Sequence, residues 1–329
     1  METSKSHLLK PTSKTVHWGY YKSDLKPVLE INAGDTVTIG AVTSTSPADF
    51  EAGGIDPSLI PEAHKEIWRE YDVKDKGPGA HILTGPIYIK GTEPGDTLEV
   101  HIKDVRITAP FGFNRNQYGR GTLPEDFPYY AIRILRLDLE KMTSDVFPGI
   151  VIPLRPFFGN LGVAPVTVQG RISSGPPGIH GGNMDHKELI AGTVLYLPVH
   201  VKGALFSAGD GHAVQGDGEV NLSALETFVE GTFEFRVLKN KRIRWPRAET
   251  PTHFITMGLD EDLDVAAKIA VREMIDYLHE ERAISSEYAY MITSLIVDLH
   301  VTQVVDIVKG IHAMVPKKIF EKRYQQSIA

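Results

Sequence analysis

Residues 209–219 read GDGHAVQGDGE, which places carboxylates, an imidazole and an amide among glycines and small apolar residues. An apolar neighbourhood makes an unpaired carboxylate costly, so each of these side chains should have a partner. A bound cation is the simplest partner that several carboxylates and an imidazole can share. On a β-strand, Asp210 and His212 project to the same face because they are two residues apart. The segment therefore predicts a metal-binding strand in a β-rich fold.

The second half of this segment is expected to return polar groups to the same place. Gln215 follows His212 after two small residues, and the Gly-Asp-Gly bend at residues 216–218 would bring back the carboxylate of Glu219. Glycines also let the backbone approach a ligand closely. One histidine with two or three carboxylates suits Zn²⁺ at a hydrolytic site, or a harder ion such as Ca²⁺. We interpret Asp217 as part of the turn and not as a ligand.

A second candidate segment lies upstream, where residues 178–185 read GIHGGNMD. Its glycines favour a loop, and loops are where site residues tend to lie. His180 and Asp185 are candidates for the remaining metal ligands. Asn183 could orient an amide or a carbonyl by hydrogen bonding.

A plainer interpretation stands beside this one. Asp-Gly pairs favour tight turns, so Asp210 and Asp217 could belong to two hairpin turns with solvated carboxylates. His180 taken alone is more often a loop-surface residue than a ligand. Glu226 is consistent with a simple strand end, and His81 is expected to be structural.

Residues 1–245 are rich in turn signals that precede β-branched or alternating stretches. Strands are expected at Thr36–Val42, Thr97–Val105 and Thr193–Val201, each after a glycine-containing turn. Further strands are expected at residues 82–90, 131–138, 194–199, 203–207 and 231–237. Residues 110–128, which include Asn114 and Arg115, are expected to form a long loop, and such loops are often functional.

The pattern changes after residue 245. A strand is expected at His253–Met257, a helix from Leu263 to Leu278, a second helix from Ser285 to about residue 295, and a strand at residues 297–303. The fold class is therefore α+β, mainly β. We predict one compact catalytic unit over residues 1–329, with a β-rich portion at 1–245 that carries the site and an α-rich portion at 246–329.

The composition excludes several classes of protein. The net charge is −7 and no basic run is present, so neither nucleic acid nor an anionic membrane is an expected partner. The absence of cysteine rules out disulfides, zinc–thiolate sites and thiol nucleophiles. No apolar stretch approaches the length of a membrane span, and residues 1–10 are polar, so a cytoplasmic protein is expected.

Several segments resemble the acetamidase/formamidase family, in the same order along the chain. They are HWGY at 17–20, GPIYI at 85–89, EPGD at 93–96, GIHGGNMD at 178–185, GDGHAVQGDGE at 209–219 and WPR at 245–247. The resemblance implies a jelly-roll-like β-sandwich with a smaller β-barrel and a C-terminal strand–helix–helix–strand unit. It also implies hydrolysis of short aliphatic amides such as formamide and acetamide to the acid and ammonia, a bound divalent metal, and a homodimer or larger homo-oligomer.

The residues and the resemblance together suggest a metal-assisted hydrolysis of amides. Zinc is the expected ion, with calcium as an alternative second or structural ion, and the expected ligands are His180, Asp185, Asp210 and His212. A metal ion lowers the pKa of a bound water toward ~7 and polarises a carbonyl.

Three further side chains complete this hypothesis. Glu219 would act as general base and pass the proton to the leaving nitrogen, while Asn183 and Gln215 would orient the substrate amide. The main alternative is a non-catalytic, metal-containing β-sandwich that binds a small ligand. A cupin-type oxygenase or isomerase fits less well, because Asp210 occupies the position where such a site has its first histidine.

Overall fold

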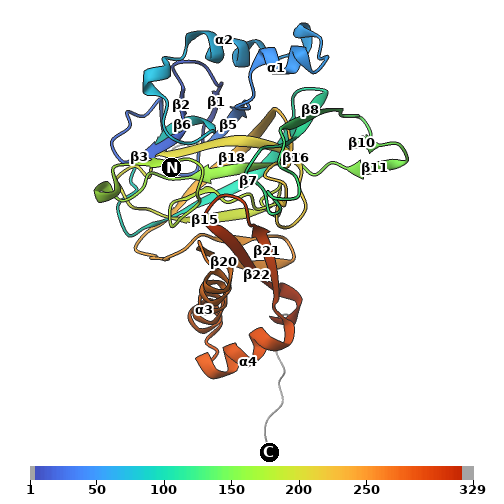
Figure 1. Cartoon of the computed structure of the whole chain (residues 1–329). Coiled ribbons are helices and arrows are strands. Elements are labelled where there is room, and N and C mark those ends of the chain that lie inside the picture. Colours follow the sequence, from blue (N-terminus) through green and yellow to red (C-terminus); the bar gives the residue numbers. More distant parts are fainter. Residues whose placement is uncertain (1–3, 321–329) are drawn as a thin grey trace, which may run out of the picture.

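Two large β-sheets pack face to face and form the body of the protein (Figure 1). The computed structural model describes residues 4–320. The strands of the first sheet are, in order, β1 (Ser6–Leu9), β5 (Thr36–Ala41), β18 (Val229–Leu238), β7 (Thr97–Ile107), β15 (Val194–Pro198), β19 (Arg247–Glu249), β20 (His253–Asp260), β22 (Lys309–Pro316) and β21 (Asp298–Gln303).

The second sheet carries the candidate site. Its main path runs through β14 (Gly181–Asn183), β12 (Phe157–Gly162), β16 (Phe206–Val214), β17 (Leu225–Glu226), β8 (Phe111–Asn116) and β9 (Ala131–Arg136). From β16 the sheet branches to β6 (Ile82–Ile89), which pairs with β2 (Val16–Trp18) and β4 (Leu29–Ile31). Two small ribbons pair β10 (Thr143–Phe147) with β11 (Ile150–Pro153) and β13 (Arg171–Ser173) with β3 (Tyr20–Lys22).

The core lies between the two sheets and is built from the inward-facing side chains of both. Residues alternate between buried and half-buried along β5, as expected for a strand with one face on a core. Phe158 of β12 meets Phe233 of β18 with ring centroids 5.3 Å apart, and Phe206 of β16 meets Phe235 of β18 at 5.1 Å. Such edge-to-face pairs stabilise a core beyond the area they bury. They fix the two strands, β12 and β16, that lie under the site.

The prediction of a mainly β, α+β fold is confirmed, with local differences. The expected strand at 203–207 is instead a turn through Ala204 and Leu205, both at φ +57°, and β16 begins at Phe206. The expected loop at 110–128 opens with strand β8. The smaller β-barrel does not form within residues 4–320, because the strand order of each sheet is an open path that does not close.

The C-terminal part extends the first sheet and covers it with helices. It runs from β20 through α3 (Leu263–Arg282) and α4 (Ser286–Ile296) to β21 and β22, and its helices lie beyond the end of the sandwich (Figure 1). Asp262 caps α3 by accepting hydrogen bonds from the backbone N–H groups of Asp264 and Val265. A Cβ at Gly258 would meet the backbone of Ala266, so glycine permits the close packing of α3 on β20. The strand–helix–helix–strand prediction is correct, but it omits β22.

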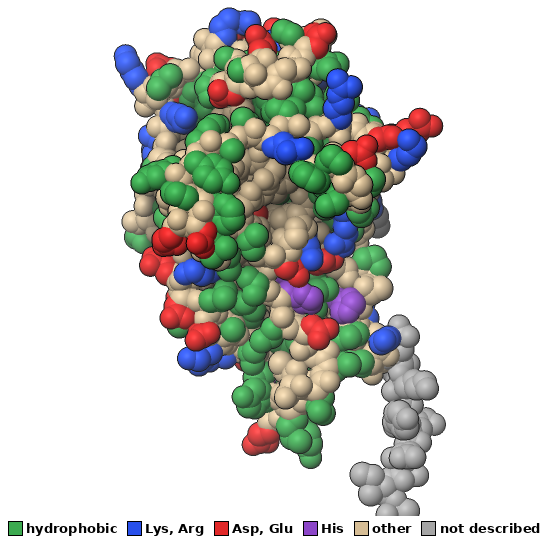
Figure 2. Space-filling view, turned by 45° about the vertical axis from the view of Figure 1, so that its right-hand side comes forward, with side chains coloured by type: hydrophobic (Ala, Val, Ile, Leu, Met, Phe, Trp, Pro, Cys, Tyr) green, Lys and Arg blue, Asp and Glu red, His purple; other side chains and the backbone are tan. Residues whose placement is uncertain are grey.

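The remaining helices are short. They are α1 (Pro47–Ala52), α2 (Glu62–Glu70), and the 3₁₀ turns η1 (Pro57–Leu59), η2 (Val73–Asp75), η3 (Thr167–Gln169) and η4 (Lys317–Phe320). Across residues 4–320, no helix combines the length and the apolar character that a membrane crossing requires. Acidic and basic side chains are mixed over the face shown in Figure 2, where neither sign forms a continuous patch.

Candidate metal centre

Strand β16 carries the histidine and the aspartate that define the site. It pairs with β12 along one edge and with β6 and β17 along the other. The backbone at Asp210 has φ +63°, a left-handed conformation that aspartate tolerates better than most residues. His212 Nε2 lies 3.3 Å from Asp210 Oδ2, so the two side chains meet as their spacing predicts.

Three carboxylates face the same nitrogen of His212. In addition to Asp210, Glu226 Oε1 lies 3.4 Å and Asp185 Oδ1 3.9 Å from Nε2. Glu226 is directly opposite His212 in the pairing of β16 with β17. Burial lowers the pKa of His212, but the charges of Glu226 and Asp210 outweigh burial and raise the pKa well above its ordinary value. The imidazole is therefore held in a strongly negative environment.

Gln215 fixes the protonation of the other nitrogen of His212. Gln215 Nε2 donates to the backbone carbonyl of Asp185 at 2.8 Å, so Gln215 Oε1 faces His212 Nδ1 at 3.0 Å. Because an amide oxygen only accepts hydrogen bonds, Nδ1 carries a proton. In the neutral ring the lone pair of Nε2 then points at carboxylate oxygens, which requires a proton or a cation between them. Gln215, expected to orient a substrate, thus orients a histidine.

The centre holds more carboxylates than cationic side chains. Its members are Asp185, Asp210, Glu219, Glu226 and Asp306. Burial, together with repulsion between neighbouring carboxylates, raises the pKa of Asp185 and of Glu219 well above the usual range. Burial also raises the pKa of Asp210, but the charges of His212 and His81 more than offset it and the pKa is lowered. This excess of buried negative charge favours binding of a cation.

Two overlapping sets of side chains are arranged to hold a metal ion. Asp185, His212 and Glu219 form one set, Asp210, His212 and Glu226 form the other, and the ligand atoms of each set lie within 4.8 Å of one another. Oδ1 of Asp185 is buried and has no hydrogen-bond partner, which suits an ion ligand. The residues present therefore fit a divalent metal. Glu219, expected to be a base, lies close enough to be a ligand.

Gly159 of β12 provides the space in which these side chains meet. A Cβ there would contact Oδ1 of Asp185 and would lie 2.5 Å from Oδ2 of Asp210 and 2.8 Å from Cε1 of His212. The backbone N–H of Asp185 donates to the carbonyl of Gly159 at 3.1 Å, so this strand also positions a ligand. No motif in the sequence indicates this glycine.

The Gly159→Ala substitution should disturb the centre more than the fold. Filling this space should displace Asp185 and Asp210, lower metal affinity, and cost about 1–3 kcal/mol of stability, as overpacking usually does. Metal content per chain and the thermal midpoint check this result. Gly175→Ala is the matched control, since a Cβ there meets only Ser173 Oγ at an ordinary 3.5 Å. Equal metal content in the two variants would contradict the conclusion that Gly159 leaves room for the metal ligands.

Asn183 links the carboxylates and is itself held in place. Its Nδ2 donates to Asp185 Oδ2 at 2.7 Å and to Asp306 Oδ2 at 2.9 Å. Its Oδ1 accepts from Asn160 Nδ2 at 3.3 Å, and Tyr21 donates to Asn160 Oδ1 at 2.6 Å. Asn183, expected to orient a substrate, here positions two carboxylates.

His180 lies outside both ligand sets. Its buried ring meets Tyr21 with centroids 5.0 Å apart. Burial, together with the charge of His200, lowers the pKa of His180 to about 3, so the ring is neutral. The positive φ values of Gly181 and Gly182 turn the chain between His180 and Asp185, and only the aspartate reaches the centre.

Two carboxylates of the centre were not among the predicted ligands. Glu226 looked like a strand end, and only the cross-strand pairing with His212 reveals its position. Asp306 follows β21 in the C-terminal part, far from the motif segments, and no local pattern indicates it. The site is therefore assembled from both the β-rich and the α-rich portions of the chain.

A small cavity adjoins the carboxylates and could admit a small ligand. Its volume is about 40 Å³, and its other walls include Thr43, Ser44, His81, Phe113 and Arg115. Since one water needs roughly 10–15 Å³ by this measure, the cavity holds a group of only a few non-hydrogen atoms. Nε of Arg115 is buried and lacks a hydrogen-bond partner, so it is a donor available to a ligand.

The metal-free protein should lose stability as the pH rises above about 6.5. The folded chain keeps a proton on His212 that the unfolded chain releases above its ordinary pKa of 6.5. The raised pKa values of Asp185 and Glu219 act in the same direction, beginning above their ordinary pKa values of about 4. Because the folded state binds more protons in this range, the free energy of unfolding falls with rising pH. Thermal melts of chelator-treated protein below and above about pH 6.5, without and with added Zn²⁺, check the prediction. A metal-free midpoint that rises with pH would contradict it.

These features define a β-sandwich protein with a carboxylate–histidine centre that fits a divalent metal, beside a small cavity. The chain belongs to the acetamidase/formamidase family, whose family model matches residues 10–169 and 168–322. The resemblance seen in the motifs is thereby confirmed. The family is one of hydrolases that act on linear amides.

Named relatives and a solved structure agree with this membership. The chain is 26% identical over 317 residues to a formamidase of Methylophilus methylotrophus, covering 73% of this chain and 77% of the relative. It is 26% identical over 293 residues to an acetamidase of Mycolicibacterium smegmatis, covering 64% and 72%. A Schizosaccharomyces pombe relative is 30% identical over 214 residues, but the match spans only 49% of this chain and 52% of that protein. A crystal structure of an acetamidase from Bacillus halodurans superposes with a TM-score of 0.80 at 30% identity, over 95% and 98% of the two chains.

Proposed function

We propose that this protein is a metal-dependent amidase that hydrolyses short aliphatic amides, such as acetamide and formamide, to the carboxylic acid and ammonia. The observation that carries the proposal is the orientation of His212, whose Nδ1 proton is held by Gln215 and whose Nε2 faces three carboxylates. The names of the relatives supply the substrate class. The small cavity is consistent with substrates of three or four non-hydrogen atoms.

The proposed ligands of the metal are Asp185, Asp210 and His212, with Glu226 added by its position opposite the histidine. His180 is left out because it lies outside both ligand sets. When bound, a divalent ion would supply Lewis acidity to the amide carbonyl and would make a water more acidic. An N/O ligand set of this kind suits zinc, and its many carboxylates also accommodate calcium as a second ion.

Glu219 is the proposed carrier of the proton. One of its oxygens accepts a hydrogen bond from the backbone N–H of Ala224 at 3.0 Å, which holds the carboxylate at the cavity wall. Its raised pKa brings proton uptake closer to neutral pH. Glu219 would take a proton from the attacking water and deliver it to the nitrogen, because ammonia leaves far more readily than an amide anion. Arg115 would donate to the substrate through the nitrogen that has no other partner.

An ammonia-release assay tests the proposal directly. Metal-analysed protein is incubated with formamide, acetamide and propionamide, before and after chelation and after Zn²⁺ is added back. Ammonia release that falls on chelation and returns with metal supports a metal-dependent amidase. Undiminished activity after verified metal removal would contradict metal dependence, and failure to release ammonia from any amide would favour a ligand-binding β-sandwich.

We extend the proposal to a homo-oligomeric, cytoplasmic enzyme. Helix α4 presents Tyr288, Tyr290, Met291 and Leu295 to solvent, and an exposed apolar group of this kind often marks a protein interface. Light scattering after gel filtration measures the oligomeric state. A monomer at micromolar concentration would contradict this part of the proposal.

A further inference from the structure

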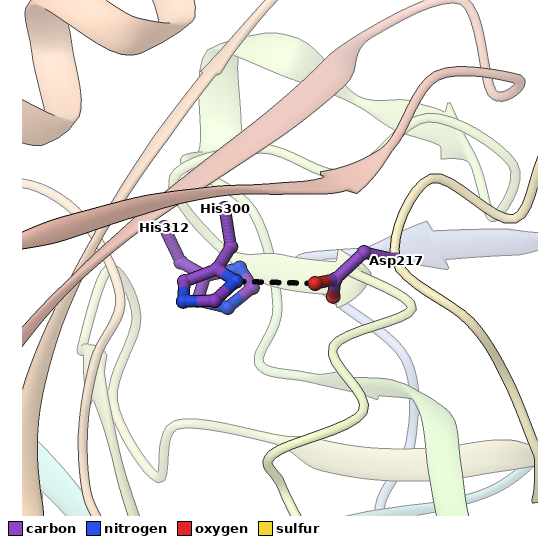
Figure 3. Close-up of side chains that lie close together, drawn as sticks. All are labelled: Asp217, His300 and His312. Atoms are coloured by element: carbon purple, nitrogen blue, oxygen red, sulfur yellow. Dashed lines mark hydrogen bonds and ion pairs between the residues drawn. The ribbon is translucent and has the colours of Figure 1, made fainter.

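A second group of ionisable side chains lies where the turn after β16 meets the C-terminal strands. Asp217 comes from the turn, His300 from β21 and His312 from β22 (Figure 3). Each can offer one ligand atom, and these three atoms lie within 4.8 Å of one another. Asp217 Oδ2 lies 3.1 Å from His300 Nδ1. None of these three residues belongs to the ligand sets of the carboxylate–histidine centre.

Two buried imidazole nitrogens at this place have no hydrogen-bond partner. Nδ1 of His312 is hydrogen-bonded to Oγ1 of Thr302 at 2.8 Å. Its Nε2 has no hydrogen-bond partner, although the residue is only 1% exposed. The ring of His186 packs against that of His312 with centroids 4.0 Å apart, and its Nε2 is also buried and unpaired. An unsatisfied buried polar group costs about 1–3 kcal/mol. A cation bound to Nε2 of His312 would remove this cost for His312.

The imidazole of His312 is available as a ligand because it is neutral. Burial lowers the pKa of His312 well below its ordinary value. Metal ions bind the neutral ring through its lone pair. The side chains of His300 and Asp217 are 36% and 31% exposed, so an ion can enter from solvent.

Lys187 fixes the carboxylate of the group. Its Nζ lies 3.0 Å from Asp217 Oδ1, while Oδ2 faces His300. A carboxylate held through one oxygen can bind an ion through the other. Metal ligands are commonly oriented in this way by a neighbouring side chain. The ammonium charge also lowers the affinity for a cation. We therefore expect weaker binding here than at the carboxylate–histidine centre.

We propose that Asp217, His300 and His312 form a second metal site that takes Zn²⁺. Two imidazoles with one carboxylate form a donor set that favours zinc and related transition ions over Ca²⁺ or Mg²⁺. The rings of His300 and His312 are stacked, with centroids 5.0 Å apart and planes 9° apart. Because ring lone pairs lie in the ring planes, binding turns the His300 ring toward the ion. The side chain of His300 is 36% exposed and has room to turn.

An ion at this site would fix the turn that ends at Glu219. The turn already joins β21, since Gly218 N–H donates to Thr302 at 3.2 Å and Val304 N–H donates to Gly218 at 3.1 Å. Bridging Asp217 to both His300 and His312 would strengthen this connection between the turn and the C-terminal strands. The assignment of the site does not depend on the amidase activity proposed above.

Zinc titration of stripped, tag-free protein tests the site. The Asp210→Asn variant serves as the background, because it weakens the carboxylate–histidine centre and isolates the second site. Each of the substitutions His300→Gln and Asp217→Asn, added to this background, should abolish one class of Zn²⁺ binding in calorimetry. Each should also lower the bound metal by about one ion per chain. His279→Gln, at an exposed histidine of α3, is the matched control and should leave binding unchanged. Circular dichroism verifies that each variant is folded.

Unchanged zinc stoichiometry and affinity in both folded variants would overturn the proposal. If one variant does not fold, the other decides, since His300 and Asp217 occupy different elements. Anomalous diffraction at the zinc edge from wild-type crystals gives an independent result, with a peak between His300 and His312 expected and its absence at saturating zinc counting against the site. A protein that binds zinc here yet releases no ammonia would contradict only the proposed function.

Discussion

The His212→Gln variant should lose the metal of the carboxylate–histidine centre and most of its activity. We expect kcat/KM for acetamide to fall by more than about 100-fold. Mutating a residue that only supports a metal ligand already lowers metal affinity or activity by roughly 10–100-fold. The physical reason is that His212 belongs to both candidate ligand sets, so its loss weakens each of them. Glutamine retains similar bulk but supplies no imidazole nitrogen. Metal analysis by mass spectrometry and ammonia release measure the two effects.

The control for this variant is His279→Gln, which changes the same residue type at an exposed position on α3. It should retain the metal content and the activity of the wild type. Asp210→Asn should resemble His212→Gln, because its carboxylate lies 3.3 Å from the same nitrogen. If both His212→Gln and Asp210→Asn kept full metal content and full activity, the ligand assignment would fail.

Replacing Glu219 with glutamine should lower kcat by about 10²- to 10⁴-fold, the usual contribution of a general base. The substitution preserves shape but removes the negative charge of Glu219 and its ability to carry a proton. Burial and neighbouring carboxylates raise the pKa of Glu219, so its loss should also change the acidic limb of the pH–rate profile. Steady-state kinetics across pH and the metal content of the variant check the prediction.

Metal content separates the two roles that the geometry allows for Glu219. A Glu219→Gln variant that retains its metal but loses activity identifies a proton carrier, while joint loss identifies a ligand. Glu261→Gln, far along the chain in an exposed turn before α3, should match the wild type. Full activity of the Glu219→Gln variant would exclude both roles.

The sequence predicts the parts of the site that depend on local geometry. Asp210 and His212 meet because side chains two apart on a strand share a face, and this alternation is visible in the residues. Asp185 reaches the same place because the glycines before it form strand β14, which pairs with β12, and not the expected loop. The mainly β class and the two C-terminal helices also follow from turn signals and helical spacing.

The parts that depend on the pairing of distant segments are not visible in a single sequence. Glu226 joins His212 through the register of β16 with β17, and Gly159 makes room from β12. The role of Gln215 depends on a shift of register between His212 and Val214, which a strand pattern does not reveal. His180 is carried away from the centre by two glycines at positive φ, a backbone choice that the residue type permits but does not require.

In the proposed site, the position of Asp306 after β21 makes amide hydrolysis depend on the C-terminal strands β21 and β22. Its carboxylate reaches Asn183 across 123 positions of sequence, and the nearby turn at Gly218 pairs with Gln303. A nascent chain whose β21 and β22 have not yet left the ribosome would lack Asp306, one of the residues that line the cavity. Proteolytic removal of β21 and β22 should likewise abolish the activity, because it removes Asp306 from the proposed site.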